Sequence, residues 1–297
     1  MLQSIFDFLK DKDLKYKERV NLSKLSSLGI GAIAPLVVYP DSIEKLVELV
    51  KYLEKINFPY KIVGRMTNIL FASCKIEFVI VATSHIDKIK FSADSVIAEC
   101  GAPIPRIARL SAERNLAGFE QLSGIPASVG GAIRSNAGAY GVEISELIEA
   151  IEALDKKNGE SVVLHSEDCD FSYRHSIFQG DRYVILFATF KLCFAEHDVF
   201  DRMEYFRQRR IATQPYGERS IGSTFKRPEN GFAAQMIDEC GLKGLRIGNV
   251  QVSEKHAGFI VNLGLGTAND YLELMSIVTR TVHERFGVLL EPEIEIF

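Results

Sequence analysis

The chain has 297 residues, 47% of them hydrophobic, and its 39 acidic and 35 basic side chains leave a formal net charge of −4. A chain of this size can bury enough apolar surface for two or three subdomains. The acidic balance argues against general nucleic-acid binding, which needs a basic face. No hydrophobic run is long enough to cross a bilayer.

The N-terminal stretch MLQSIFDFLKDKDLKYKERV predicts a short amphipathic helix and lacks the layout of a signal peptide. The chain has five widely spaced cysteines and no CxxC pair, so we expect a cytoplasmic protein with free thiols. His165, Cys169 and His175 lie close in sequence, but their spacing matches no common zinc pattern. We therefore expect no metal site.

Hydrophobic periodicity predicts alternating helices and strands in the first two-thirds of the chain. The expected elements are a strand at 36–39, a helix that starts after Pro40-Asp41-Ser42, strands at 60–63, 79–82 and 95–99, a helix at 105–115, a hairpin at 151–164 and a strand at 183–194. A charged helix, HDVFDRMEYFRQRRIATQ, then opens a new unit.

That unit is predicted to contain a strand at 259–262, a helix capped by Thr267 and Asp270, and a final strand in LLEPEIEIF. The elements are mixed and do not alternate strictly, which indicates an α+β fold. We place a soft boundary near residue 86 and the main boundary near residue 198.

Two glycine-containing stretches are candidates for ligand binding. GRMTNIL follows a strand, and a turn of this kind can present amides to phosphate oxygens, although for this motif taken by itself a plain turn is the favoured explanation. In SGIPASVGGAIRSNAGAYG, from Ser123 to Gly141, twelve of nineteen residues are Gly, Ala or Ser. Either a ligand lies against this bare backbone or the chain packs tightly on itself, because glycine serves both purposes.

The second stretch resembles the flavin-binding segment of UDP-N-acetylenolpyruvoylglucosamine reductases. The segments that match this family in the same order are SSLGIGAIAPLVVYP, KIVGRMTNIL, DFSYRHSIF, IGSTFKRP, NVQVSEKHAGFIVN and LEPEIEI. Together they cover the chain from about Ser23 to Phe297. The coverage and order make the resemblance specific, whereas each motif alone would not.

The resemblance implies an FAD-binding unit of the vanillyl-alcohol-oxidase (PCMH) type in two subdomains, residues 1–86 and 87–197, and a C-terminal α+β substrate domain, residues 198–297. It implies non-covalent FAD and NADPH as reductant. The reaction would reduce the enolpyruvyl ether of UDP-N-acetylglucosamine to UDP-N-acetylmuramate in the synthesis of peptidoglycan. The expected partners are these small molecules, and we expect a monomer.

The resemblance also implies which residues contact FAD. They are Gly64, Thr67, Asn68, Ile69, Leu70, Ser123, Gly124, Ile125, Pro126, Gly130, Gly131, Ala132, Asn136, Ala137 and Gly138. Met66 departs from the family, which has a glycine there, and a methionine is not expected to take φ > 0. The short stretch from Arg174 to Arg207 indicates the subgroup without a tyrosine-bearing loop, and we expect the last strand, ending at Phe297, to fray.

Reduction of an unsaturated carboxylate builds negative charge that must be stabilised while one carbon is protonated. Arg174 is the candidate cation, because a guanidinium can hold a carboxylate by two parallel hydrogen bonds. Ser223 is the candidate proton donor to C2, after hydride from flavin N5 has reached C3. Glu293, protonated after burial has raised its pKa, is the candidate hydrogen-bond donor to the enolate. Taken singly, the three residues have ordinary alternatives: a surface ion pair, a strand serine and a solvated edge-strand carboxylate.

Further candidates for substrate contacts are Tyr173, Lys226, Arg227 and His256. The charged helix HDVFDRMEYFRQRRIATQ, called the linker helix below, has a positive face formed by Arg207, Arg209 and Arg210, which could attract anionic substrates. Two alternatives stay open, an FAD-dependent oxidase of the same superfamily and a non-catalytic UDP-sugar-binding protein.

Overall fold

The computed structural model describes residues 2–297, which divide into two compact units. The first contains residues 2–19, 35–65 and 77–207, and the second contains residues 20–34, 66–76 and 208–297. Each unit has its own core of buried hydrophobic side chains. The second unit thus includes two short stretches that the sequence analysis assigned to the first subdomain, and the division at residues 86 and 198 stays a prediction.

A four-stranded sheet with the order β1-β2-β5-β3 forms one part of the first unit. Its strands are β1 (Lys15–Asn21), β2 (Ile33–Tyr39), β5 (Val79–Ala82) and β3 (Tyr60–Val63), and both β2 and β3 run parallel to β5. Helices α1 (Leu2–Asp11) and α2 (Ile43–Lys55) contribute buried side chains to the same core as β2 and β5. Ser42 caps α2 as predicted, since its hydroxyl accepts from the amide of Lys45 (3.3 Å).

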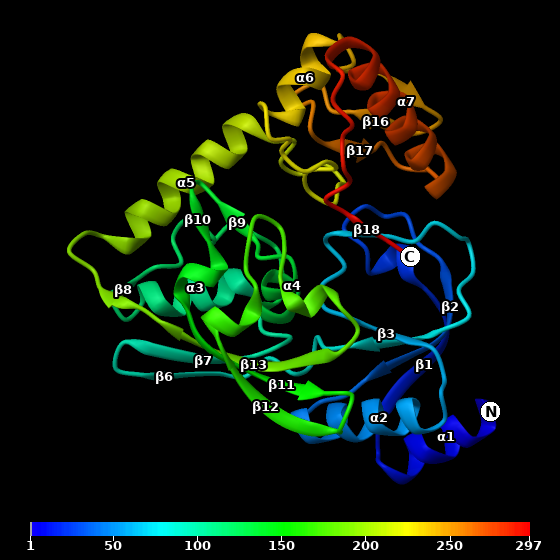
Figure 1. Ribbon diagram of the computed structural model, residues 1–297, viewed down its shortest axis with the longest axis vertical. Coiled ribbons are helices and arrows are strands. Elements are labelled where there is room, and N and C mark those ends of the chain that lie inside the picture. Colours follow the sequence, from blue (N-terminus) through cyan, green and yellow to red (C-terminus); the bar gives the residue numbers. More distant parts are fainter. Residues whose placement is uncertain (1) are drawn as a thin grey trace. The chain divides into compact units, whose positions relative to one another are not determined.

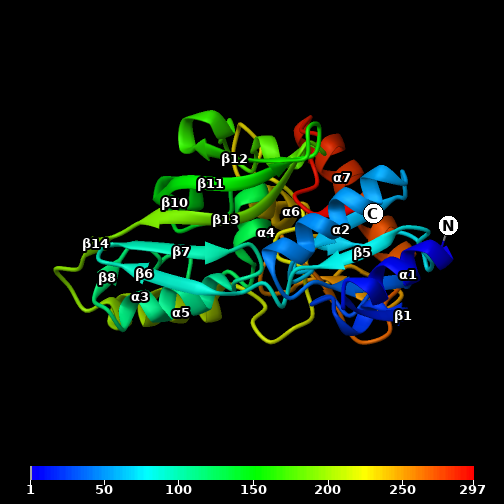
Figure 2. The same ribbon diagram turned by 90° about the horizontal axis from the view of Figure 1, so that it is seen from below.

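A five-stranded antiparallel sheet with the order β12-β11-β13-β7-β6 forms the other part, and Figure 2 shows these strands side by side in that order. The strands are β6 (Ile89–Ser92), β7 (Ser95–Glu99), β11 (Ile148–Asp155), β12 (Glu160–His165) and β13 (Tyr183–Lys191). Helices α3 (Ile104–Ala112) and α4 (Val129–Arg134) lie over one face of this sheet (Figure 1).

Short elements complete the first unit. They are β8 (Leu116–Ala117), β9 (Gly138–Ala139), β10 (Val142–Glu143), the 3₁₀ turns Ile144–Leu147, Ser166–Cys169 and Ile177–Gln179, and β14 (Cys193–Phe194), which pairs with β8. Helix α4 was not predicted, because its sequence VGGAIR contains two glycines and reads as loop. Ser128 caps it, and the carbonyl oxygen of Cys100 lies 3.3 Å from the place that a Cβ on Gly130 would take.

The second unit combines helices with short strands. It contains the 3₁₀ turn Leu22–Lys24, β4 (Ile69–Leu70), α6 (Ala233–Glu239), β15 (Arg246–Ile247), β16 (Val250–Val252), β17 (Ile260–Asn262), α7 (Ala268–Phe286) and β18 (Glu295–Ile296). Strands β15, β16 and β17 form an antiparallel sheet, and β18 pairs in parallel with β4. Helix α5 (Val199–Thr213) contains the point at which the first unit ends and the second resumes.

Most predicted elements are confirmed, including the hairpin of β11 and β12 and the capping box that Thr267 and Asp270 form at the start of α7. The predicted fraying of the last strand is wrong. The amide of Phe297 donates to the carbonyl of Leu70 (2.9 Å), and the amide of Ala72 donates to the carbonyl of Phe297 (2.7 Å). The Phe297 ring also contacts Phe71, with 5.9 Å between ring centroids, so the strand is held to its end. No helix in residues 2–297 combines the length and hydrophobicity needed to span a membrane.

A buried carboxylate in the first unit makes stability depend on pH. Arg182 donates to both oxygens of Asp155, with distances of 3.2 and 2.7 Å from Nε to Oδ1 and from Nη2 to Oδ2. These hydrogen bonds hold the pKa of Asp155 below its usual value, although burial opposes the shift. A depressed pKa in the folded state adds stability above the pKa of the unfolded chain, about 3.9, and this stability is lost as pH falls through the folded value.

We expect Asp155→Asn to lower Tm near neutral pH, because it leaves Arg182 without its carboxylate. The difference in Tm between wild type and variant should shrink as pH falls below about 4. Thermal unfolding followed by circular dichroism between neutral and acidic pH measures both effects. A difference in Tm that is independent of pH would contradict this role for Asp155.

Candidate flavoenzyme site

The loop after β3 has an unusual backbone at Met66. Met66 adopts φ = +51°, and its side chain is 4% exposed. The expectation that methionine would not take this conformation was therefore wrong. A left-handed residue other than glycine costs about 1–2 kcal/mol, whereas burial of a methionine side chain contributes about 1.5–3 kcal/mol, so burial can offset the strain.

Two main-chain amides in this loop lack acceptors among the described residues. The N–H groups of Met66 and Asn68 donate to no protein atom that the structure describes. A left-handed residue inside a turn aims neighbouring amides towards a common point, which is the geometry of an anion-binding nest. Unpaired amides at such a turn fit the diphosphate of FAD, so the residues present fit this cofactor.

The loop is fastened to the C-terminal strand within the second unit. The side-chain amide of Asn68 donates to the carbonyl of Glu293 (3.1 Å), and the amide of Glu295 donates to the carbonyl of Asn68 (2.9 Å). Ile69 and Leu70 continue as β4 and pair with Glu295 and Ile296. The predicted cofactor loop and the predicted catalytic carboxylate are therefore adjacent in the chain's tertiary structure.

Close chain contacts explain several glycines in the first unit. A Cβ on Gly64 would lie 2.0 Å from the Ser128 hydroxyl oxygen, and one on Gly138 would lie 2.8 Å from the carbonyl oxygen of Val142. A Cβ on Gly130 would lie 3.3 Å from the carbonyl oxygen of Cys100. Tight chain contacts, the second of the two explanations considered for the small-residue stretch, thus apply at Gly130 and Gly138. Gly131 is exposed, and its backbone remains open to a ligand.

Asn136 and Ser123 make hydrogen bonds within the protein. Asn136 is fully buried with φ = +42°, and its side-chain amide donates to Glu143 Oε2 (2.8 Å) and the carbonyl of Ser172 (3.0 Å). The Ser123 hydroxyl donates to the carbonyl of Glu120 (2.7 Å). Asn136 therefore joins the small-residue stretch to the DFSYRHSIF segment, and its predicted contact with FAD stays a prediction.

Arg174 is oriented by the small-residue stretch. Its guanidinium donates to the carbonyl of Gly138 (3.3 Å) and lies 4.0 Å from Glu143 Oε1. It also lies over the ring of Tyr173, 4.9 Å from the centroid, and the Arg174 side chain is only 17% exposed. Arg174 itself has φ = +55°, a conformation that is uncommon outside glycine and is often found at functional sites. This environment differs from that of a solvated surface ion pair.

Main-chain bonds in the second unit bring the segments of Ser223 and Glu293 side by side. Ser223 bridges to Phe259 on one side, and Phe225 bridges to Pro292 on the other. The amide of Glu293 donates to the carbonyl of Thr224 (2.9 Å). Both Ser223 and Glu293 are half-buried. The structure thus brings together two of the three predicted catalytic residues, while Arg174 belongs to the first unit.

The remaining candidates have diverse surroundings. Lys226 lies 3.5 Å from Glu291, an exposed pair, and Arg227 lies over the ring of Phe232. Burial lowers the pKa of His256, and its Nδ1 accepts from the amide of Gly258 (3.2 Å), so the neutral imidazole fits this position. On the linker helix, Arg207 donates to Glu204 (2.6 Å), which neutralises that part of the predicted positive face.

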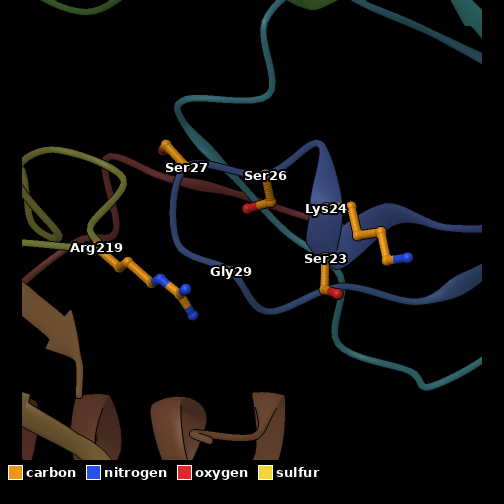
Figure 3. A pocket seen from close by; sticks show the side chains of 6 residues that line it. All are labelled: Ser23, Lys24, Ser26, Ser27, Gly29 and Arg219. Carbon is orange, nitrogen blue, oxygen red and sulfur yellow. The ribbon is translucent and has the colours of Figure 1, made fainter. Parts of the chain in front are cut away.

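A polar cavity of about 320 Å³ in the second unit was not predicted. It is lined by Ser23, Lys24, Ser26, Ser27, Gly29 and Arg219. In Figure 3 the guanidinium of Arg219 extends towards Gly29, where an added Cβ would lie 3.1 Å from it, and Lys24 points away from Arg219. The lining of the cavity contains two cations and no carboxylate. No sequence motif marked it, because its residues come from two segments about 190 positions apart. The hydroxyl of Ser27 joins these segments by donating to the carbonyl of Ser220 (2.7 Å).

Comparison with known proteins agrees with this arrangement. The FAD binding domain family matches residues 34–165, and the C-terminal domain of UDP-N-acetylenolpyruvoylglucosamine reductase matches residues 214–297. The UDP-N-acetylenolpyruvoylglucosamine reductase of Caldicellulosiruptor saccharolyticus is 41% identical over 292 residues, which cover 97% of this chain and 91% of the relative. The chain belongs to the UDP-N-acetylenolpyruvoylglucosamine reductase family. It is therefore an FAD-dependent oxidoreductase.

Solved structures support the same fold. The crystal structure of UDP-N-acetylenolpyruvylglucosamine reductase (MurB) from Thermus caldophilus has a TM-score of 0.81 and 30% identity, and it covers 96% of this chain and 99% of its own. A xylooligosaccharide oxidase from Myceliophthora thermophila has a TM-score of 0.50 and 14% identity over 64% of this chain and 43% of its own, a likeness of fold alone. The predicted α+β fold, with an FAD-binding unit and a C-terminal substrate domain, is confirmed.

The contact between Gly64 and Ser128 gives a specific prediction. We expect Gly64→Ala to destabilise the protein by about 1–3 kcal/mol, as overpacking does, because the new methyl would meet the Ser128 hydroxyl oxygen at 2.0 Å. Adding Ser128→Gly should recover most of this loss, since glycine is also tolerated as a helix cap. Chemical denaturation of the single and double variants measures both values.

Gly131→Ala is the matched control in this experiment. Its added Cβ would lie at an ordinary 3.4 Å from the Ser128 hydroxyl oxygen, so stability should not fall. Equal losses in Gly64→Ala and in the double variant would contradict the steric explanation.

Proposed function

We propose that the protein catalyses the NADPH-dependent reduction of the enolpyruvyl ether of UDP-N-acetylglucosamine to UDP-N-acetylmuramate. Membership of the reductase family and near-complete coverage of its relatives support this proposal. The observation that carries it is the main-chain bond from Glu293 to Thr224, which sets the segment that carries this carboxylate beside the segment of Ser223. This arrangement lies in the part of the chain that matches the C-terminal domain of the reductase family.

FAD, when bound, supplies hydride to the substrate after reduction by NADPH. The amides of Met66 and Asn68 would hold its diphosphate, because neither donates to a protein atom in the part of the chain that the structure describes. Gly131 would let the cofactor approach the backbone closely, since its position is exposed and has no side chain. The other cofactor contacts implied by the family resemblance remain part of this proposal.

Arg174 would bind and polarise the carboxylate of the substrate. Its guanidinium cannot lose its proton at physiological pH, and two protein carbonyls fix its orientation before substrate binds. A preoriented cation needs little reorganisation when charge develops on the substrate, which favours the enolate. Tyr173 supports the guanidinium from one face and would contribute to substrate binding.

Ser223 would transfer its hydroxyl proton to C2 of the substrate, while hydride adds to C3. The proton and hydride together saturate the carbon–carbon double bond, so the electrons balance. Glu293, in its protonated form, would donate a hydrogen bond to the enolate oxygen. Lys226, Arg227 and His256 would contact the nucleotide-sugar part of the substrate.

An anaerobic experiment in two steps tests this function. The purified protein with bound FAD is mixed first with NADPH and then with the enolpyruvyl sugar, while the flavin absorbance is followed. We expect bleaching after the first addition and recovery after the second. Recovery with oxygen and not with the sugar would favour an FAD-dependent oxidase, and failure to bleach would favour a protein that binds UDP-sugars without catalysis.

We expect Ser223→Ala to bind FAD and to be bleached by NADPH at close to the wild-type rate. Recovery of absorbance with the sugar should slow at least about 100-fold, the usual scale for loss of a positioned proton donor. Ser223→Cys, which keeps an ionisable proton, is the matched variant and should retain part of the rate. Wild-type recovery in Ser223→Ala would remove Ser223 from the mechanism.

We expect Arg174→Lys to lower kcat by about 100-fold, although the charge is retained, because one ammonium cannot reproduce the planar fork. Steady-state kinetics with the enolpyruvyl sugar measure the change. Arg174→Gln removes the charge as well and should be slower still. Turnover of Arg174→Lys at the wild-type rate would show that two parallel hydrogen bonds are not required.

A further inference from the structure

Thr224 lies between the segments that carry the two catalytic candidates of the second unit. Its amide donates to the carbonyl of Gly258 (2.8 Å), and its carbonyl accepts from the amide of Glu293 (2.9 Å). One residue therefore links the segment that follows His256 to the segment that carries Glu293. A sideways shift of Thr224 would move Ser223, its covalent neighbour, and Glu293, its hydrogen-bonded neighbour, at the same time.

The side chain of Thr224 has one polar partner, which lies on another element. Thr224 Oγ1 is 3.1 Å from the phenol oxygen of Tyr271 on α7, and both residues are fully buried. Burial raises the pKa of Tyr271, so the phenol stays neutral and can donate or accept. Among the described residues, these two hydroxyls form hydrogen bonds only with each other.

Helix α7 is a firm support for this contact. Thr267 and Asp270 cap its first turn reciprocally, and Tyr271 follows directly after them. Further along, Leu274, Val278 and Val282 are almost completely buried on the same helix. The phenol oxygen of Tyr271 is therefore held in a fixed place relative to the core of the second unit.

A hydroxyl pair in this place needs an explanation other than stability. Two buried hydroxyls that bond to each other contribute little net stability, and two apolar groups of the same shape would be about as stable. A hydrogen bond is directional, however, whereas apolar contact allows a side chain to slide. The directional contact fixes the rotamer of Thr224 and thus the position of the residue that follows Ser223 in the chain and accepts a hydrogen bond from Glu293.

We propose that Thr224 and Tyr271 form a positioning pair, which holds the Ser223 hydroxyl and the Glu293 carboxyl in the geometry that protonates and stabilises the substrate. Neither residue touches the substrate in this role. The proposal rests on the proposed function, because it assigns Thr224 and Tyr271 to the proton-transfer step. Small displacements of groups that transfer protons slow a reaction strongly, so a weak contact can have a large effect on rate.

The test compares Thr224→Val, Tyr271→Phe and the double variant in the FAD-bound enzyme. Each single variant leaves one buried hydroxyl without a partner and should lower Tm by several degrees. The double variant removes both hydroxyls and should recover most of the wild-type Tm. If the pair positions Ser223, the recovery of absorbance with the sugar stays at least about tenfold slow in the double variant, despite the restored Tm.

Three further measurements separate positioning from stability. Thr224→Ser keeps the hydroxyl and should restore the sugar-dependent rate to within about threefold of wild type. Slow proton transfer should also increase the solvent isotope effect on that rate in the double variant. Val278→Ala on α7, which deletes buried methyl groups about two turns along the helix from Tyr271 and leaves both hydroxyls in place, should lower Tm and leave the isotope effect unchanged.

The outcomes distinguish this proposal from the proposed function. A double variant with the wild-type Tm, rate and isotope effect would overturn the positioning role, even if Ser223→Ala is slow. A Ser223→Ala variant with the wild-type rate would instead overturn the assignment of the proton donor, whatever the behaviour of the pair. Bleaching by NADPH should be unchanged to within about twofold in all these variants, since the pair acts after that step.

Discussion

The arrangement of the second unit depends on main-chain hydrogen bonds along the last seven residues of the chain. On one side, the amide of Glu293 donates to Thr224, and on the other, the amides of Glu295 and Phe297 donate to Asn68 and Leu70. These bonds do not depend on which side chains are present, so they fix the backbone and leave the side chains free for chemistry. The proposed proton donor and carboxylate occupy neighbouring segments because the backbone is bonded in this way.

The small-residue stretch has two separate purposes. At Gly138 and Gly130 the missing side chain makes room for the protein's own carbonyl groups. The side-chain amide of Asn136 donates to Glu143 and to the carbonyl of Ser172, and so joins that stretch to the segment of Arg174. Only exposed positions such as Gly131 leave backbone available to a ligand. A stretch that reads as one ligand-binding surface is thus partly a close-packed segment that orients Arg174, the cation proposed to bind the substrate carboxylate.

The fold was predictable where hydrophobic periodicity and caps agreed, as in α2 behind Ser42 and α7 behind Thr267. Helix α4 was not, because two glycines lower helix propensity and the tertiary contact that explains Gly130 is not visible in the sequence. Met66 was misjudged for a related reason: the strain of its backbone is visible in a sequence, but the burial that offsets it is not. Ser223 and Glu293 came from family resemblance, whereas the contact of Thr224 with Tyr271 joins positions with no shared motif.

The pairing of β18 with β4 has a consequence for biosynthesis. Glu295 and Ile296 meet Ile69 and Leu70, so the partners are separated by most of the polypeptide. Translation delivers β4 early, yet its partner strand leaves the ribosome among the last residues. The first unit can pair its strands as they leave the ribosome. The second unit cannot fold until the C-terminal residues are made, so its early stretches, residues 20–34 and 66–76, stay unpaired and exposed to chaperones or to neighbouring chains.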